Sequence, residues 1–208
     1  MEAKPSSMTK FDLPTQLINV FHQEILDEIF NPAIELNSHV IEDSQPTLFS
    51  LDLNKVLDWL QTHEYPKSLE KEPCQTPVLL YVPKFSLKHL LFHYDGTTDS
   101  ARIIHKFLLL FEDLIKESKA TIISPSFIPK SRSKEEQDII QKISSATKET
   151  SFIKFNFMRI GDFWSYAVQH DCTLLVTTKT YQQELSNVLF DFYKGELWDD
   201  QLSFYLSL

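Results

Sequence analysis

Two aspartates are the residues whose positions in this sequence most readily suggest chemistry. Asp52 ends the apolar run Leu48-Phe49-Ser50-Leu51, and Asp162 follows Gly161 at the start of a short apolar helix pattern. Carboxylates gathered in one place supply the oxygen ligands that magnesium or manganese needs in phosphodiester hydrolysis. Alternatively, each carboxylate caps the helix that follows it. The pair therefore predicts either a divalent-cation site or two helix caps.

Two histidines offer a second possible metal site. His89 and His93 are four residues apart in a segment, from about 86 to 93, that we predict to be a helix. That spacing on one helix face suits two zinc ligands. Because the sequence places no further ligands beside them, we do not expect a zinc site there.

The carboxylates need elements that bring them to one edge of a sheet. Leu174-Leu175-Val176 is an unbroken apolar run, typical of a strand covered by helices on both faces. Strands and helices alternate along the chain, which indicates an α/β fold with a mainly parallel sheet. Strands are expected at about 47–52, 78–82, 120–124, 152–157 and 174–176, and helices at about 17–30, 53–60, 86–93, 98–117, 133–146, 162–170 and 181–193. In such folds, the carboxyl ends of the strands form the usual site.

The order of these motifs resembles that of the PIN domain, a family of metal-dependent ribonucleases, over about residues 47–195. In that family an aspartate closes the first strand, as Asp52 does, and another opens a later helix, as Asp162 does. A second acid lies in a Pro-x-x-x-Leu-x-Glu-Leu segment, where the stretch Pro83-Lys84-Phe85-Ser86-Leu87-Lys88-His89-Leu90 has His89 instead. A fourth acid follows the last core strand, where Thr177-Thr178-Lys179 has Lys179 instead.

The resemblance implies a three-layer α/β fold, with a central, mainly parallel sheet flanked by helices. It also implies that Asp52, His89, Asp162 and Lys179 form the remnant of a nuclease site. An ammonium group beside the remaining carboxylates would neutralise them and repel a metal ion. We therefore expect an inactive domain that holds neither a metal ion nor another cofactor.

One further likeness concerns the end of the chain. The stretch Asn187-Val188-Leu189-Phe190-Asp191-Phe192-Tyr193-Lys194 is similar to the C-terminal helix of degenerate PIN domains in nonsense-mediated mRNA decay factors. Some members of that group are docking modules. The resemblance thus implies a protein-interaction module in RNA surveillance, with the RNA helicase of the decay pathway as its partner.

Two other functions stay open. The first is a weak endoribonuclease that depends on magnesium or manganese, with one ion held by Asp52 and Asp162. The second is a non-catalytic binder of single-stranded RNA. Its candidate contacts are the basic residues Lys130, Arg132 and Lys134, although such a cluster is more often a solvated loop.

Composition narrows the function classes. The 29 acidic and 20 basic residues give a net charge of −9, so no overall positive field attracts nucleic acid or an anionic membrane. Three glycines provide no glycine-rich phosphate loop. The two cysteines and the absence of an apolar run long enough to span a membrane predict a reducing, cytoplasmic location.

The chain divides into three parts in this interpretation. Residues 1–46 form an N-terminal extension with an amphipathic helix and a linker, 47–195 form the α/β domain, and 196–208 form a C-terminal tail. The amphipathic helix packs either on its own domain or in the groove of a partner. The tail is apolar enough either to dock back on the domain or to bind something else. Ser133, followed three residues later by Glu136, predicts a capping box at the start of the 133–146 helix.

Overall fold

The computed structural model describes residues 48–54, 77–157, 159–178 and 202–207. Seven strands in this part of the chain form one sheet: β1 (Phe49–Asp52), β2 (Pro77–Tyr81), β3 (His89–His93), β4 (Lys119–Ser124), β5 (Glu149–Lys154), β6 (Leu174–Thr177) and β7 (Ser203–Ser207). The described residues also form the helices α3 (Thr98–Phe111), α4 (Ser133–Ala146) and α5 (Ile160–Gln169), and the short 3-10 helices η1 (Glu112–Leu114) and η2 (Lys130–Arg132). None of these helices is long and apolar enough to span a membrane.

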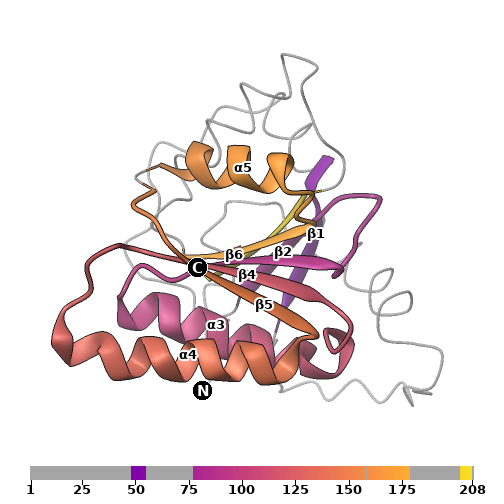
Figure 1. Cartoon of the computed structure of the whole chain (residues 1–208). Helices are drawn as coiled ribbons and strands as arrows, with labels where there is room; N and C mark the ends of the chain where they lie inside the picture. Colours follow the sequence, from indigo (N-terminus) through magenta and orange to yellow (C-terminus); the bar gives the residue numbers. More distant parts are fainter. Residues whose placement is uncertain (1–47, 55–76, 158, 179–201, 208) are drawn as a thin grey trace, which may run out of the picture.

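The strand order is β1-β2-β7-β6-β3-β4-β5. Neighbouring strands are parallel everywhere except between β2 and β7, which are antiparallel. The strands β1 and β2 therefore run opposite to the other five. Helices α3 and α4 cover one face of the sheet and α5 lies on the other, as Figure 1 shows. The predicted three-layer α/β architecture with a mainly parallel sheet is confirmed.

The main core lies between the sheet and the helices α3 and α4. Side chains alternate along each strand, so Leu90 and Phe92 of β3 point to α3 while His89, Leu91 and His93 point to α5. Phe107 of α3 packs between aromatic rings from three elements, with ring centroids 5.4 Å from Phe92, 4.7 Å from Phe111 and 5.1 Å from Tyr205. Burial of this apolar face explains why β3, β6 and β7 are central strands.

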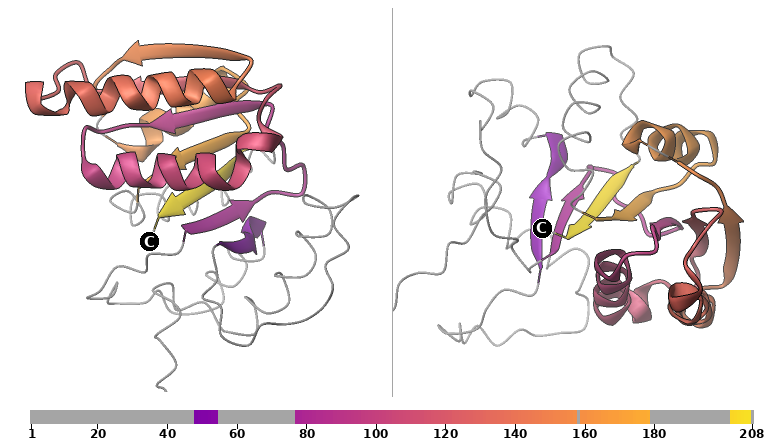
Figure 2. Two further views of the ribbon diagram at one scale, coloured as in Figure 1. Left: turned by 90° about the horizontal axis from the view of Figure 1, so that it is seen from below. Right: turned by 90° about the vertical axis from the view of Figure 1, so that its left-hand side faces the viewer.

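The chain reverses its direction of winding between β3 and β6. From β3 it moves to β4 and β5 through α3 and α4, which lie side by side on one face in Figure 2. From β5 it crosses the other face through α5 and returns to β6, on the opposite side of β3. A reversal of this kind is a topological switch point. In open α/β sheets, ligands bind at the carboxyl ends of the strands at such a point.

The structure corrects one predicted element. The segment predicted as a helix over 86–93 contains β3 instead, because Leu90, Leu91 and Phe92 are fully buried in the middle of the sheet. His89 and His93 therefore lie at opposite ends of a strand, about 13 Å apart at about 3.3 Å per residue. They are not neighbours on a helix, so the zinc hypothesis based on their spacing is wrong.

Some predicted helix and strand boundaries also differ from those in the structure. Helix α4 spans the predicted residues, but its N-cap is Arg132 and no side chain caps it, so the predicted capping box is wrong. Helix α3 ends at Phe111, and η1 continues only to Leu114. Part of the predicted C-terminal tail is β7, which lies between β2 and β6 within the sheet. The predicted helices 17–30 and 181–193, and the predicted helix beyond Asn54, lie outside the described residues.

Candidate functional site

The carboxyl ends of β3 and β6 carry a buried polar pair. His93 ends β3, Thr177 ends β6, and the histidine Nδ1 lies 3.0 Å from the threonine Oγ1. Both side chains are buried. The imidazole also packs on the ring of Phe163 in the first turns of α5, with 4.2 Å between ring centroids. On the α5 side of the sheet, the ends of β3 and β6 are therefore covered by His93, which contacts Thr177 and Phe163.

Burial decides the charge of His93. It lowers the pKa of His93 from 6.5 to about 4, although the nearby negative charge of Asp95 opposes this effect. Desolvation wins because the imidazolium form would lose its hydration, and the attraction of Asp95 is too small to offset that loss. At neutral pH the ring is therefore neutral, and only one of its nitrogens carries a proton.

The turn between β3 and α3 places a carboxylate at the same edge. The Asp95 Oδ1 accepts hydrogen bonds from the Thr97 backbone N–H at 2.8 Å and from the Thr97 hydroxyl at 2.6 Å. Gly96 permits this tight turn because its φ of 81° lies in the left-handed region. Burial alone would raise the pKa of Asp95, but hydrogen bonds from Ser100 and Thr97 lower it below its usual range. Asp95 is therefore an ionised acceptor at neutral pH.

One buried hydroxyl near this turn has no hydrogen-bond partner in the part of the chain that the structure describes. Thr178 follows the last residue of β6 and is 3% exposed, yet its Oγ1 has no hydrogen-bond partner among the described residues. Continued alternation from Leu174 and Val176 places Thr178 on the α3 face, where β6 contacts α3. An unpaired hydroxyl in such a place costs about 1–3 kcal/mol of stability, so it requires an explanation.

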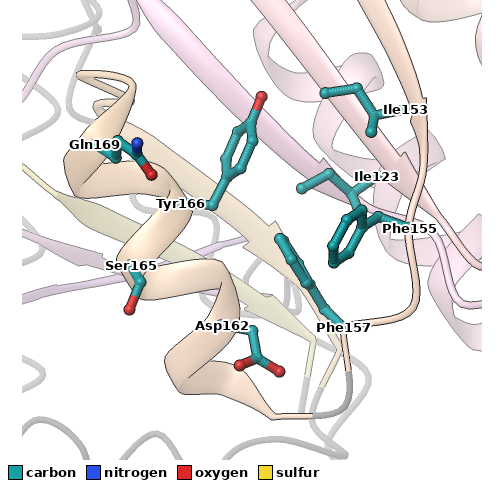
Figure 3. Close-up of a pocket in the computed structure, with 8 residues that line it drawn as sticks. All are labelled: Ile123, Ile153, Phe155, Phe157, Asp162, Ser165, Tyr166 and Gln169. Carbon is teal, nitrogen blue, oxygen red and sulfur yellow. The ribbon is translucent and has the colours of Figure 1, made fainter.

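A cavity of about 350 Å³ lies on the other face, between α5 and the strands β4 and β5. Ile123 and Ile153 form its apolar floor, as Figure 3 shows. The remaining walls come from the segment after β5 and from one side of α5, and they consist of Phe155, Phe157, Asp162, Ser165, Tyr166 and Gln169. Phe157 separates this cavity from the switch point, since its ring also packs on Phe163.

The residues of the predicted remnant site do not converge. Asp52 ends β1, which runs opposite to β3 and β6, so Asp52 lies at the edge where those strands begin. Asp162 lies in the first turn of α5, beside the carboxyl end of β3. The two aspartates thus lie at opposite ends of the strands of the sheet, and they cannot hold one metal ion. Lys179 lies outside the described residues.

His89 is separated from both aspartates. It begins β3, where its Nε2 lies 3.2 Å from the Thr121 hydroxyl, and it interacts with the backbone of His170 at the far end of α5. His89 and Asp52 lie at the same end of the sheet's strands, but β2, β7 and β6 lie between β1 and β3. Four strand spacings of about 4.8 Å put them about 19 Å apart.

Local hydrogen bonds give both aspartates a capping role. The Asp52 Oδ1 accepts from the backbone N–H of Asn54 at 2.9 Å, where a helical segment begins. The Asp162 Oδ2 accepts from the backbone N–H of Arg159 at 3.0 Å, at the start of α5. Asp52 therefore caps the helical segment that follows it, as predicted, whereas Asp162 is the third residue of α5 and reaches back to the N-cap residue Arg159.

The predicted basic cluster surrounds the start of α4. Arg132 donates hydrogen bonds to a Glu135 carboxylate oxygen at 2.9 Å and to the Thr98 hydroxyl at 2.8 Å. Its guanidinium therefore ties the start of α4 to the start of α3. Lys130 and Lys134 are exposed beside it, and an RNA contact by this cluster stays a prediction.

Comparison with known proteins gives no family. No protein-family model and no curated protein match the sequence. Protein Rv1636 of Mycobacterium tuberculosis is a solved structure with a similar arrangement, at 17% identity and a TM-score of 0.32, over 42% of this chain and 68% of that one. A universal stress protein in complex with cAMP matches at 13% identity and a TM-score of 0.33, over 44% and 71% of the two chains. A universal stress family protein from Burkholderia pseudomallei matches at 11% and 0.35, over 48% and 87%.

The expected membership of the PIN family is wrong. None of the three matching structures is named as a PIN nuclease, two of them are universal stress family proteins, and their low TM-scores assign this chain to no family. The remnant site on which the expectation depended is split between two edges of the sheet. The role in nonsense-mediated mRNA decay depended on the same resemblance, so it is withdrawn with it.

Sequence reasoning missed the residues at the switch point. His93 and Asp95 were assigned to a helix and a turn, and Thr178 was considered only as part of a degenerate motif. A signal was present, because Leu90-Leu91-Phe92 followed by His93-Tyr94-Asp95-Gly96 has the form of a buried strand with a polar turn at its carboxyl end.

Proposed function

We propose that this domain binds a small hydroxyl-bearing molecule at the switch point between β3 and β6, without transforming it. The observation that carries the proposal is the buried Thr178 Oγ1, which lacks a partner among the described residues and lies at the strand ends where open α/β sheets bind ligands. A ligand hydroxyl beside Thr178 would complete its hydrogen bonding.

The polar groups at the carboxyl ends of β3 and β6 favour a neutral ligand with a pair of hydroxyl groups. Asp95 is an ionised acceptor that already receives the Thr97 donors on Oδ1. In dinucleotide-binding α/β domains an acidic side chain accepts a hydrogen bond from a ribose hydroxyl, and we propose the same role for Asp95. The sequence has no glycine-rich loop for phosphate groups. A nucleoside fits these features better than a nucleotide does.

Several observations support a non-catalytic role. The described residues contain no group of three or more histidine, cysteine, aspartate or glutamate side chains able to hold a metal ion. A threonine hydroxyl beside a histidine can act as nucleophile and base. Here, however, His93 and Thr177 face α5, where Phe163 packs on the imidazole, whereas the proposed ligand contact Thr178 faces the other side of the sheet. We therefore propose that the domain works without a resident cofactor.

A thermal-shift series tests this function. Adenosine, guanosine, cytidine and uridine at millimolar concentration are added to the wild type and to Thr178→Val and Thr178→Ser variants. We expect at least one nucleoside to raise the melting temperature of the wild type and of Thr178→Ser, because both retain the hydroxyl. The same nucleoside should leave Thr178→Val unchanged. No shift with any nucleoside, or equal shifts in all three proteins, would refute the proposal.

Two earlier expectations continue as parts of this proposal. A cytoplasmic location is supported by the free, buried thiol of Cys172, which has no disulfide partner among the described residues. A protein partner stays a prediction that no described contact tests. Its identification as a decay helicase depended on the withdrawn resemblance.

A further inference from the structure

The cavity beside α5 has the composition of a cation-binding site. Three aromatic residues, Phe155, Phe157 and Tyr166, line it together with the acidic residue Asp162. Of its eight lining residues, none is lysine, arginine or histidine. Aromatic faces attract cations through their quadrupoles, and groups of such rings recognise quaternary ammonium groups. We infer that this cavity binds a small organic cation that carries a trimethylammonium group.

The rings are held in place by contacts outside the cavity. Phe157 packs edge-on against Phe155 at 4.9 Å and against the buried Phe163 at 4.9 Å. The Tyr166 hydroxyl is hydrogen-bonded to Thr121, and its ring stacks on His170 at 4.1 Å. In Figure 3 the three rings surround a common space over Ile123 and Ile153. The aromatic faces are therefore available without a rearrangement of the fold.

Size and exposure set the kind of ligand. A volume of about 350 Å³ is at the lower end of the range for ligand pockets, which is about 300–1,000 Å³. Phe155 is 55% exposed, so the cavity opens to solvent on the side of the edge strand β5. Cation–π attraction is weaker at exposed sites. We expect binding of a choline-sized cation at millimolar concentration.

This site differs from the switch point. Its floor residues Ile123 and Ile153 lie on the α5 face of the sheet, whereas Thr178 lies on the α3 face. The inference therefore does not depend on the proposed nucleoside site. The Thr178→Val variant should bind the cation as the wild type does, and this separates a failure of one proposal from a failure of the other.

Choline is the probe, and dimethylbutanol, its neutral isostere, is the matched ligand control. Titration followed by protein NMR should show choline binding with shifts at Phe155, Phe157 and Tyr166, and binding of the isostere should be at least about 3-fold weaker. Equal binding of the two molecules would show an apolar cleft without cation recognition and would overturn the inference. No binding of choline at 20-fold above about 1 mM would overturn it as well.

Two pairs of variants make the test specific. Phe157→Leu should weaken choline binding by about 5-fold, whereas Tyr166→Phe, which keeps the ring, should stay within about 2-fold of the wild type. Asp162→Asn removes the charge and retains a capping oxygen, and it should weaken binding by about 3-fold. A melting curve for each variant identifies any that fails to fold. Unchanged affinity in folded Phe157→Leu and Asp162→Asn proteins would contradict the assignment.

Discussion

His93 and Thr177 are joined by a hydrogen bond of 3.0 Å between Nδ1 and Oγ1, although they are 84 residues apart in the sequence. The bond links the carboxyl ends of β3 and β6, the two neighbouring strands between which the chain reverses its winding. Both side chains are buried, and Phe163 of α5 packs on the imidazole, so the pair joins the two strands on the α5 side of the sheet. The carboxylate and hydroxyl that we propose as ligand contacts, Asp95 and Thr178, lie next to it.

Stability should depend on pH through His93. Its pKa is about 4 in the folded protein and about 6.5 in the unfolded chain, so the unfolded chain takes up a proton first as pH falls. Above pH 6.5 His93 is neutral in both states and does not lower the free energy of unfolding. Between pH 6.5 and about 4 the free energy of unfolding falls as the pH is lowered. This interval corresponds to about 3 kcal/mol.

The His93→Gln variant isolates this effect. The amide can still pair with Thr177 but does not titrate, so its free energy of unfolding should fall less steeply below pH 6.5. Urea unfolding of both proteins at several pH values measures the difference. His89 and His105, whose pKa values are also lowered chiefly by burial, remain in both proteins and cancel. Parallel pH profiles would show that His93 is not a buried neutral histidine.

Tyrosine hydroxyls in two core positions should respond oppositely to removal. The Tyr205 OH is buried among Phe107 and Phe111 without a hydrogen-bond partner in the described structure. The Tyr94 OH donates to a Glu135 carboxylate oxygen at 3.1 Å. Tyr205→Phe should raise the free energy of unfolding by about 1 kcal/mol, and Tyr94→Phe should lower it by about 2 kcal/mol. Denaturant titrations measure both values, and destabilisation by Tyr205→Phe would imply a partner for its hydroxyl.

The helix starts provide another matched pair. Thr97 caps α3, because its side chain accepts from the Ser100 backbone N–H at 3.2 Å. Ser133 is the exposed first residue of α4 and caps nothing. Thr97→Ala should cost about 1 kcal/mol of stability, whereas Ser133→Ala should be within about 0.5 kcal/mol of the wild type. A larger loss from Ser133→Ala would revive the predicted capping box. Melting curves decide between the two results.

Divalent metal ions should not bind to Asp52 and Asp162 together. The two carboxylates lie at opposite edges of the sheet and accept local backbone hydrogen bonds. Calorimetric titration with manganese should give the same result for the wild type, Asp52→Ala and Asp162→Ala. A binding event in the wild type that both substitutions abolish would show that the carboxylates share an ion.

The sequence was sufficient for the elements whose periodicity matched their burial. Leu174-Leu175-Val176 predicted β6 because a strand covered on both faces is apolar throughout. The 133–146 helix was predicted from a capping box of Ser133 and Glu136, and α4 has these bounds although that capping box does not form. By contrast, Leu90-Leu91-Phe92 was assigned to a helix, because a short apolar run has no period that separates a buried strand from a buried helix.

The candidate site was harder to predict because it depends on strand direction. Asp52 does end a strand, as expected, but β7 pairs antiparallel to β2 and thereby places that strand end at the wrong edge. No local pattern in Ser203–Ser207 reveals that this segment inserts between β2 and β6. The convergence of His93, Asp95, Thr177 and Thr178 follows from that topology, and the unpaired Thr178 hydroxyl is visible only in the packed structure.

The most direct test is an NMR titration of isotope-labelled protein with adenosine, with dideoxyadenosine, which lacks the ribose diol, as the control. The proposed function predicts saturable shifts centred on Asp95, Gly96, Thr97 and Thr178 with adenosine, much weaker shifts with dideoxyadenosine, and none in Thr178→Val. Equal shifts with both nucleosides, or adenosine shifts that leave the β3 and β6 ends unaffected, would contradict it.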